Sequence, residues 1–240
     1  MTLARAASEQ PALWGGASHA GAVRRVNEDA FLGRPELGLW AVADGMGGHG
    51  RGDEASACVV EALAAAAEGD SAVARLRHAR AALDDAHVRL LARAGPTRII
   101  GATVVVLSLF GDAASLIWAG DCRAYRLRER ALERLTEDHS LVEAYGRAGG
   151  APGEAPPRHI VTRALGAGDA YDPESRTVLW RPGDAFLLCS DGLWSVVEEG
   201  VVAHLVNALP PHRAVRQLLA AALARGAPDN VTAVVVRPGA

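Results

Sequence analysis

The chain has 240 residues, half of them hydrophobic, and a formal net charge of −3 at pH 7. This length and apolar content exclude a disordered chain and allow a substantial core. The slightly acidic charge gives no electrostatic case for nucleic acid or an anionic membrane as the main partner. The apolar runs reach about half of the ~20 residues that a membrane span needs, so no membrane partner is expected either.

The basic residues and the cysteines narrow the chemistry further. All 25 basic residues are arginines, which leaves no lysine for a Schiff base or a P-loop. Cys58, Cys122 and Cys189 are odd in number and lack CxxC spacing, which predicts neither a disulfide framework nor a zinc site. Residues 1–10 do not have the shape of a signal peptide. We therefore expect a monomeric cytoplasmic protein.

In the first half of the chain, strand patterns give way to helix patterns. Strands are predicted over 12–19 and 38–43, and helices over 53–68 and 70–93. The second helix carries an apolar stripe near helical spacing, made of Val73, Leu76, Leu83 and Leu90.

The second half begins with three short β-branched or aromatic segments separated by turns, which predict an antiparallel meander over 103–109, 115–118 and 123–127. A polar segment rich in glycine and proline follows at 136–158, with one short helix expected at 140–147. The remaining expected elements are strands at 177–180, 185–189 and 231–236 and helices at 198–208 and 212–225.

This order of elements predicts an α+β fold. Strands joined by tight turns favour antiparallel sheets, and amphipathic helices in pairs are expected to cover their outer faces. Since no internal repeat or linker divides the sequence, we expect one domain over 1–240, with its core at about 12–237.

Acidic residues in short glycine-rich motifs are the strongest functional signal. They are Glu28, Asp29, Asp44, Asp121, Asp191 and Asp229. All except Asp229 are expected at, or just after, the end of a strand. Carboxylate oxygens with few cysteines or histidines among them suit Mg²⁺ or Mn²⁺, and such a cluster repels itself unless cations are present. An enzyme that hydrolyses phosphate esters is the natural owner of such a site.

Asp44 shows both the functional and the plain interpretation of these motifs. Four glycines follow within six residues, so the backbone can approach a ligand and the Gly45 carbonyl can join the carboxylate as a metal ligand. The alternative is an ordinary glycine-rich turn with aspartate as a turn former. Asp229, in Pro-Asp-Asn, is open to the same turn interpretation.

A phosphate-binding group is predicted just upstream of the first acidic pair. Arg24 lies five residues before Asp29, and a guanidinium pairs bidentately with phosphate oxygens. The neighbouring Arg25 is expected to be solvent-exposed.

Together these motifs resemble the PPM family of metal-dependent serine/threonine protein phosphatases, also called protein phosphatase 2C, in its bacterial branch. The resemblance covers about residues 18–236. The matching motifs, in family order, are Arg24-x-x-Asn27-Glu28-Asp29, Asp44-Gly45-Met46-Gly47-Gly48-His49, Gly101-x-Thr103, Gly120-Asp121-x-Arg123, Leu135-Thr136-x-Asp138-His139-Ser140, Thr162-Arg163-Ala164-Leu165-Gly166, Ser190-Asp191-Gly192-Leu193-Trp194 and Asp229-Asn230-Val231-Thr232.

The resemblance implies a four-layer fold, in which two antiparallel sheets pack face to face with helices outside. It also implies two core Mn²⁺ or Mg²⁺ ions and a weaker third one. The implied roles are first-ion ligands at Asp29, Asp191 and Asp229, a bridging ligand at Asp44, second-ion ligands at the Gly45 carbonyl and, through water, Glu28, a third-ion site at Asp121 with Asp191, and phosphate binding at Arg24.

The implied reaction is hydrolysis of phosphoserine and phosphothreonine by direct attack of a metal-bridging hydroxide, without a phosphoenzyme. Met46 stands where some eukaryotic members have a histidine proposed as general acid. The proton donor is therefore open, with water as the default and His49 or His139 as alternatives. Residues 136–158 match the family's flap, the segment beside the active site, and are a few residues short.

The implied partners are phosphorylated proteins and a cognate serine/threonine kinase, with control of a secretion apparatus as one setting. Two other functions stay open. One is a silent relative that only binds partners, although every inferred ligand is present. The other is a phosphohydrolase acting on small esters or nucleotides, for which the sequence offers neither a P-loop nor a base-binding motif.

Overall fold

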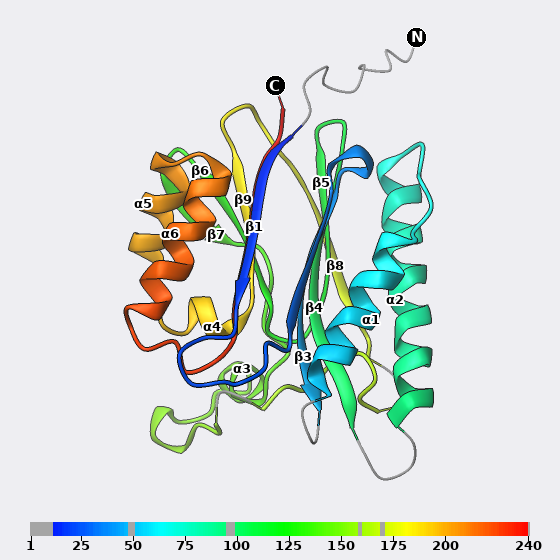
Figure 1. The fold of residues 1–240 in the computed structure, drawn as a ribbon, viewed down its shortest axis with the longest axis vertical. Helices are drawn as coiled ribbons and strands as arrows, with labels where there is room; N and C mark the ends of the chain where they lie inside the picture. The colour runs from blue at the N-terminus through cyan, green and yellow to red at the C-terminus, as the bar shows by residue number, and fades with distance from the viewer. Residues whose placement is uncertain (1–11, 48–50, 95–98, 158–159, 169–170, 240) are drawn as a thin grey trace.

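Two antiparallel sheets pack face to face and carry helices on both outer faces (Figure 1). The computed structural model describes residues 12–47, 51–94, 99–157, 160–168 and 171–239. This four-layer arrangement confirms the predicted α+β sandwich. The expected features of residues 1–10 and His49 lie outside the described residues.

Each sheet has five strands. The first sheet runs, in spatial order, through β1 (Leu13–His19), β10 (Val231–Arg237), β9 (Ala185–Cys189), β6 (Arg123–Arg128) and β7 (Ala131–Arg134). The second runs through β2 (Asp29–Arg34), β3 (Leu39–Gly47), β4 (Ile100–Phe110), β5 (Ala113–Ala119) and β8 (Glu174–Leu179).

The longer helices form the two outer layers. Those over the second sheet are α1 (Gly52–Ala64) and α2 (Ala72–Ala94), and those over the first are α5 (Glu199–Ala208) and α6 (Pro211–Leu223). The short elements are α3 (Leu141–Arg147), α4 (Asp191–Trp194) and the 3-10 turns Pro35–Leu37 and Pro152–Glu154. Both α3 and α4 lie at the end of the sandwich opposite the chain termini (Figure 1).

Strand periodicity explains how the sheets divide the core. In β3, Trp40 and Val42 are fully buried between the sheets, whereas Ala41 and Ala43 face the helix layer. Successive side chains of a strand point to opposite faces, so a strand that is buried on both sides reads as a continuous apolar run. Such a run marks a strand in a middle layer.

The predicted meander is wrong. β4 and β5 pair in one sheet, but β6 pairs with β9 and β7 in the other. A tight turn after a strand shows that the chain reverses, and it does not show which sheet the chain enters next. The connection from β5 to β6 therefore crosses the sandwich and carries the Gly120-Asp121 turn with it.

Three elements escaped prediction: β2, β7 and α4. β2 is short and polar at both ends, and α4 is a single turn, so neither has a clear period. The apolar stripe of α2 is also narrower than predicted. Leu83 and Leu90 are fully buried, but Val73 is 77% exposed.

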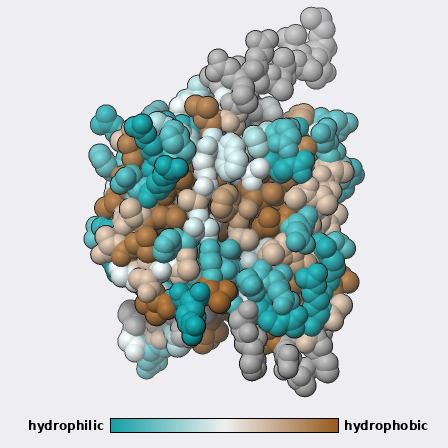
Figure 2. All heavy atoms as spheres, viewed as in Figure 1, coloured by the Kyte–Doolittle hydropathy of each residue, from teal (hydrophilic) through white to brown (hydrophobic). Residues whose placement is uncertain are grey.

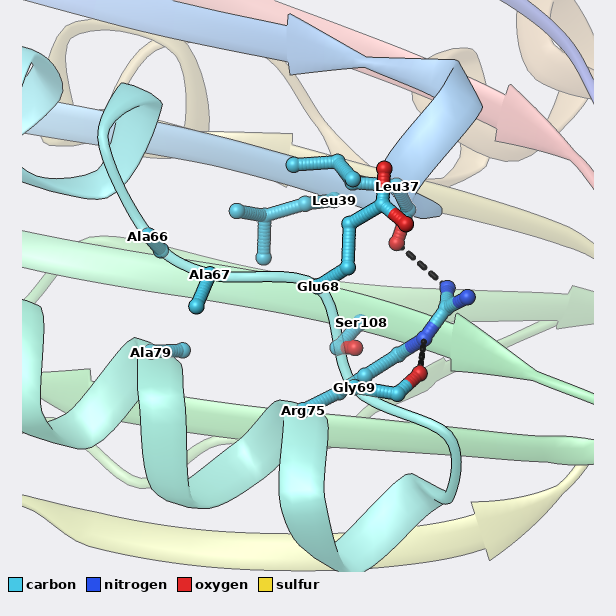
Figure 3. A pocket seen from close by; sticks show the side chains of 9 residues that line it. All are labelled: Leu37, Leu39, Ala66, Ala67, Glu68, Gly69, Arg75, Ala79 and Ser108. Atoms are coloured by element: carbon cyan, nitrogen blue, oxygen red, sulfur yellow. Dashed lines mark hydrogen bonds between the residues drawn. The ribbon is translucent and has the colours of Figure 1, made fainter.

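Arg75 joins the helix layer to the second sheet. From α2 it donates hydrogen bonds to the carbonyl oxygens of Leu37 and Gly69, around a small cavity of about 10 Å³ (Figure 3). Burial lowers the pKa of this guanidinium. The cavity has no room for a ligand, and its contacts fasten the α1–α2 connection.

Hydrophilic side chains form large groups on the face drawn in Figure 2, with hydrophobic ones between them. Of the helices in the described ranges, none is both long and apolar enough to cross a membrane.

Candidate metal and phosphate site

The predicted site residues converge at one end of the sandwich. Asp121 and Asp191 follow β5 and β9, Asp29 begins β2, and Asp229 precedes β10. Strands of alternating direction place strand starts and strand ends at the same edge. Two details of the prediction are wrong, because Asp29 starts its strand and Asp44 lies within β3.

Sheet register pairs two of the carboxylates. Asp29 stands opposite Asp44 in the β2–β3 ladder. Asp29 is 8% exposed, and its Oδ2 accepts a 2.7 Å hydrogen bond from the Ser190 hydroxyl. Its Oδ1 is buried and has no partner among the described residues. A buried carboxylate oxygen without a partner is costly, so this atom is suited to a ligand.

Burial and mutual repulsion raise the pKa values of these carboxyl groups. Burial raises the pKa of Asp29 to about 6, with a further contribution from the charge of Asp191. The pKa of Asp191 also rises to about 6, through burial and then the charge of Asp229. Asp44 has a pKa well above the usual range. The main cause is burial, followed by the charge of Asp29 and then that of Asp191. These shifts show that the carboxylates share one electrostatic cluster.

Hydrogen bonds fix both the side chain and the backbone of Glu28. Its Oε1 accepts a 2.8 Å hydrogen bond from the Gly52 amide at the start of α1, and its own amide donates to Asn230 Oδ1 at 2.8 Å. Its carbonyl accepts from the Gly45 amide at 3.0 Å. A Cβ atom on Gly52 would stand 2.6 Å from both Glu28 Oε1 and the Gly45 carbonyl oxygen. Only glycine therefore allows α1 to begin this close to the acidic residues.

Arg24 reaches the cluster from the β1–β2 loop. Its Nη2 donates a 2.8 Å hydrogen bond to Asp229 Oδ2, and this contact raises its pKa. The arginine side chain is 53% exposed, so its remaining N–H groups are accessible. Arg25 is exposed, as expected.

Asn230 fastens that loop. Its side-chain nitrogen donates to the carbonyls of Ala20 and Val26 at 3.0 and 2.9 Å, while its Oδ1 accepts from Glu28. Three of its amide's bonds are thus used to hold the segment that carries Arg24. The sequence presents Asn230 as a turn residue after Asp229, and nothing in the turn pattern announces these contacts.

Asp121 lies at the edge of the cluster, next to the flap. It is 5% exposed, and burial together with the charges of Asp191 and Asp138 raises its pKa to about 7. The Trp194 indole nitrogen donates to its carbonyl at 3.0 Å. Asp121 therefore belongs to the same electrostatic group as the other carboxylates.

His139, an alternative proton donor, sits in a structural network. Its Nδ1 accepts from the Gly120 amide at 3.2 Å, and its Nε2 lies 3.3 Å from Glu174 Oε1 and 3.3 Å from Arg163 Nη1. Burial, and then the charge of Arg163, lowers its pKa. Both ring nitrogens are therefore engaged, Nδ1 with the Gly120-Asp121 turn and Nε2 with Glu174 and Arg163.

The three cysteines, Cys58, Cys122 and Cys189, are buried and form no disulfide.

The chemistry of this end suits a hard divalent cation. Five aspartates and one glutamate supply oxygen atoms, which Mg²⁺ and Mn²⁺ prefer, and one carboxylate oxygen is buried without a partner. In the described ranges, no group of three or more histidine, cysteine, aspartate or glutamate side chains is arranged so that it could hold a metal ion. The carboxylates are close enough to repel one another, and a bound cation would relieve that repulsion.

Comparison with known proteins points to one family. A family model for protein phosphatase 2C matches residues 16–236. The serine/threonine protein phosphatase PstP of Mycobacterium tuberculosis is 34% identical over 225 residues. The match covers 91% of this chain but only 43% of PstP, so the chain spans less than half the length of that relative.

Two solved structures share the fold closely. PppA, a key regulatory component of T6SS in Pseudomonas aeruginosa, has a TM-score of 0.89 and 39% identity, with 95% of this chain and 98% of that chain covered. The catalytic domain of PstP in complex with 2 manganese ions has a TM-score of 0.81 and 31% identity, over 94% of this chain and 97% of that chain.

Proposed function

Because the chain belongs to the protein phosphatase 2C family, we propose that it is a metal-dependent serine/threonine phosphoprotein phosphatase. Its substrates are phosphoserine and phosphothreonine residues of other proteins. One observation carries the proposal: carboxylates from both sheets meet at one end of the sandwich, where Asp29 Oδ1 is buried without a partner among the described residues. Family membership and the manganese bound by the PstP catalytic domain support it.

The chain's own residues would hold two core ions of Mn²⁺ or Mg²⁺ and a weaker third. The proposed ligands are Glu28, Asp29, Asp44, the Gly45 carbonyl, Asp121, Asp191 and Asp229. When bound, such ions activate water and neutralise charge on phosphoryl oxygens. The carboxylates then lose the protons that their raised pKa values retain, so binding becomes tighter as pH rises.

Arg24 is proposed to bind the phosphoryl group. In this structure its guanidinium pairs with Asp229, and its exposed N–H groups can pair bidentately with phosphate oxygens. The Arg24 guanidinium is then already in place to stabilise the negative charge that develops on the phosphoryl oxygens in the transition state. Such electrostatic stabilisation is the main way in which enzymes lower the barrier to phosphoryl transfer. Water is the proposed donor of the leaving-group proton, with His49 as the alternative, because both ring nitrogens of His139 are engaged elsewhere.

A phosphatase assay with two substrates tests the proposal. Purified chain is incubated with a phosphothreonine peptide or a nucleoside triphosphate, each with Mn²⁺ or with EDTA. Phosphate released from the peptide only with Mn²⁺ is the expected result. Metal-dependent release from the nucleotide alone would favour the small-ester phosphohydrolase. No release from either would favour a silent, partner-binding relative.

The cellular role proposed is opposition to a bacterial serine/threonine kinase. The likeness to PppA favours a kinase that controls a secretion apparatus, since PppA is a key regulatory component of T6SS in Pseudomonas aeruginosa. Comparing the phosphoproteins of a deletion strain with those of its parent tests this role. Phosphosites that rise in the deletion strain should fall again when the chain is restored.

A further inference from the structure

A cavity of about 160 Å³ lies beside Asp121, between the body of the protein and the flap. Trp194 and Arg123 line it from the body, and Val142 and Glu143 line it from the flap. It is smaller than the about 300–1,000 Å³ of pockets that enclose whole small molecules. Its size therefore fits a single amino-acid side chain.

The cavity adjoins the phosphate site. Asp121 forms part of its wall and is close enough to Asp191 for the charge of that carboxylate to raise its pKa. Trp194 closes α4, the helical turn that Asp191 begins. A residue next to the phosphorylated residue of a bound substrate is therefore within reach of the cavity.

Among the described residues that line the cavity, Arg123 is the only arginine, and its guanidinium already has partners. Arg123 Nε and Nη2 donate to Asp138 at 2.9 and 2.6 Å, and the guanidinium carbon stacks 3.5 Å from the centre of the Trp194 ring. This pair cancels the charges of Arg123 and Asp138. It also covers one face of the tryptophan and fixes the wall of the cavity.

Among the described residues that line the cavity, three are carboxylates and one is an arginine: Asp121, Asp138 and Glu143, with Arg123. Asp138 pairs with Arg123, and Asp121 is a proposed ligand of the third ion. Glu143 has a loose ion pair with Arg134, whose Nη2 stands 3.7 Å from Glu143 Oε1, beyond hydrogen-bond distance. The cavity thus combines an apolar wall, made of Trp194 and Val142, with an excess of negative charge.

We propose that this cavity receives a lysine or arginine side chain that flanks the phosphorylated residue of the substrate. The aliphatic stem of such a side chain packs on Trp194 and Val142, and its cation meets Glu143, whereas Asp121 is left for the proposed third ion. This inference rests on the proposed phosphatase function and deepens it, since it selects phosphoproteins with a basic residue beside the phosphosite.

Phosphothreonine peptides that differ at one position test it. Each peptide carries lysine or norleucine at one of the positions on either side of phosphothreonine, and kcat/KM is measured at one Mn²⁺ concentration. Norleucine keeps the stem and removes the charge. A partly exposed ion pair predicts a preference for lysine of about two- to fivefold at one position or more.

Two flap variants assign that preference to the cavity. Glu143→Gln is expected to lower it to less than about half, because the cation loses its partner. Glu154→Gln removes the same charge from an exposed flap residue outside the cavity, and it should leave the preference intact. For both variants the readout is the ratio of kcat/KM for the lysine peptide to kcat/KM for the norleucine peptide, which a general loss of activity leaves unchanged.

Each result decides the matter. Equal hydrolysis of lysine and norleucine peptides, or a preference that Glu143→Gln leaves intact or that both variants reduce alike, would overturn the inference while the phosphatase function stands. If no peptide is hydrolysed with Mn²⁺, the proposed function fails and this inference falls with it.

Discussion

Asp191→Asn replaces a carboxylate with an amide of the same shape inside the acidic cluster. Burial, and then the charge of Asp229, raises the pKa of Asp191 from 3.8 to about 6. Because the folded state holds this proton more tightly than the unfolded state, metal-free stability falls as pH rises through about 4 to 6. Two pH units correspond to about 3 kcal/mol, at about 1.4 kcal/mol for each unit.

The variant escapes this penalty because an amide carries no charge. In EDTA at about pH 8, we expect its free energy of unfolding to exceed that of the wild type by about 1–3 kcal/mol, and the difference should vanish near pH 4. Mn²⁺ at about 100 times its dissociation constant adds about 2.7 kcal/mol to the wild type and should add little to the variant. Its turnover should fall at least about 100-fold.

Urea unfolding with EDTA and with Mn²⁺, at both pH values, measures these quantities. Asp112→Asn, at an exposed turn, is the matched control and should change none of them. If Asp191→Asn is less stable than the wild type in EDTA near pH 8, the carboxylate has a structural role. If Mn²⁺ still stabilises the variant fully, Asp191 is not a ligand. Either result would refute the reasoning.

Three further variants probe the phosphate contact, the start of α1 and the core. Arg24→Ala should lower kcat/KM by about 30- to 1,000-fold, the equivalent of about 2–4 kcal/mol, with Mn²⁺ affinity retained in calorimetry; an unchanged kcat/KM would remove Arg24 from its role. Gly52→Ala places a Cβ 2.6 Å from Glu28 Oε1 and should raise the Mn²⁺ concentration for half-maximal stabilisation about tenfold. Gly200→Ala, with open space around it, is the control and should leave that Mn²⁺ concentration unchanged. If both variants raise it equally, the contact between residue 52 and Glu28 does not matter for Mn²⁺ binding. Phe186→Ala empties a fully buried position between the sheets and should cost about 3–5 kcal/mol of unfolding free energy; a loss below about 1 kcal/mol would contradict the packing described.

Elements with a strong period were predictable from the sequence. The strand at 185–189 has the bounds of β9, and the helix at 198–208 differs from α5 by one residue at its start. β2 and α4 escaped because β2 is short with polar ends and α4 is a single turn. The meander failed because β6 changes sheets, and local sequence pattern does not encode the sheet to which a strand belongs.

The acidic motifs could be found in the sequence, but the groups that support them could not. Ser190 and Asn230 follow ordinary strand-end and turn patterns, yet they bind Asp29 and Glu28 across 161 and 202 residues of chain. Contacts of such long range leave no local signal. Arg123 and Trp194 likewise meet only because the β5–β6 turn and α4 arrive at the same end of the sandwich.

The sequence by itself determined the layer order and the kind of chemistry. Apolar periods specify which faces must be buried, and carboxylates in glycine-rich turns specify oxygen ligands. Only the tertiary structure decided that Asp29 stands opposite Asp44, that one oxygen of Asp29 is left without a partner, and that a small acidic cavity opens beside Asp121. The physical reason is that sheet register and the packing of two sheets place side chains together, and both depend on the whole chain rather than on neighbouring residues.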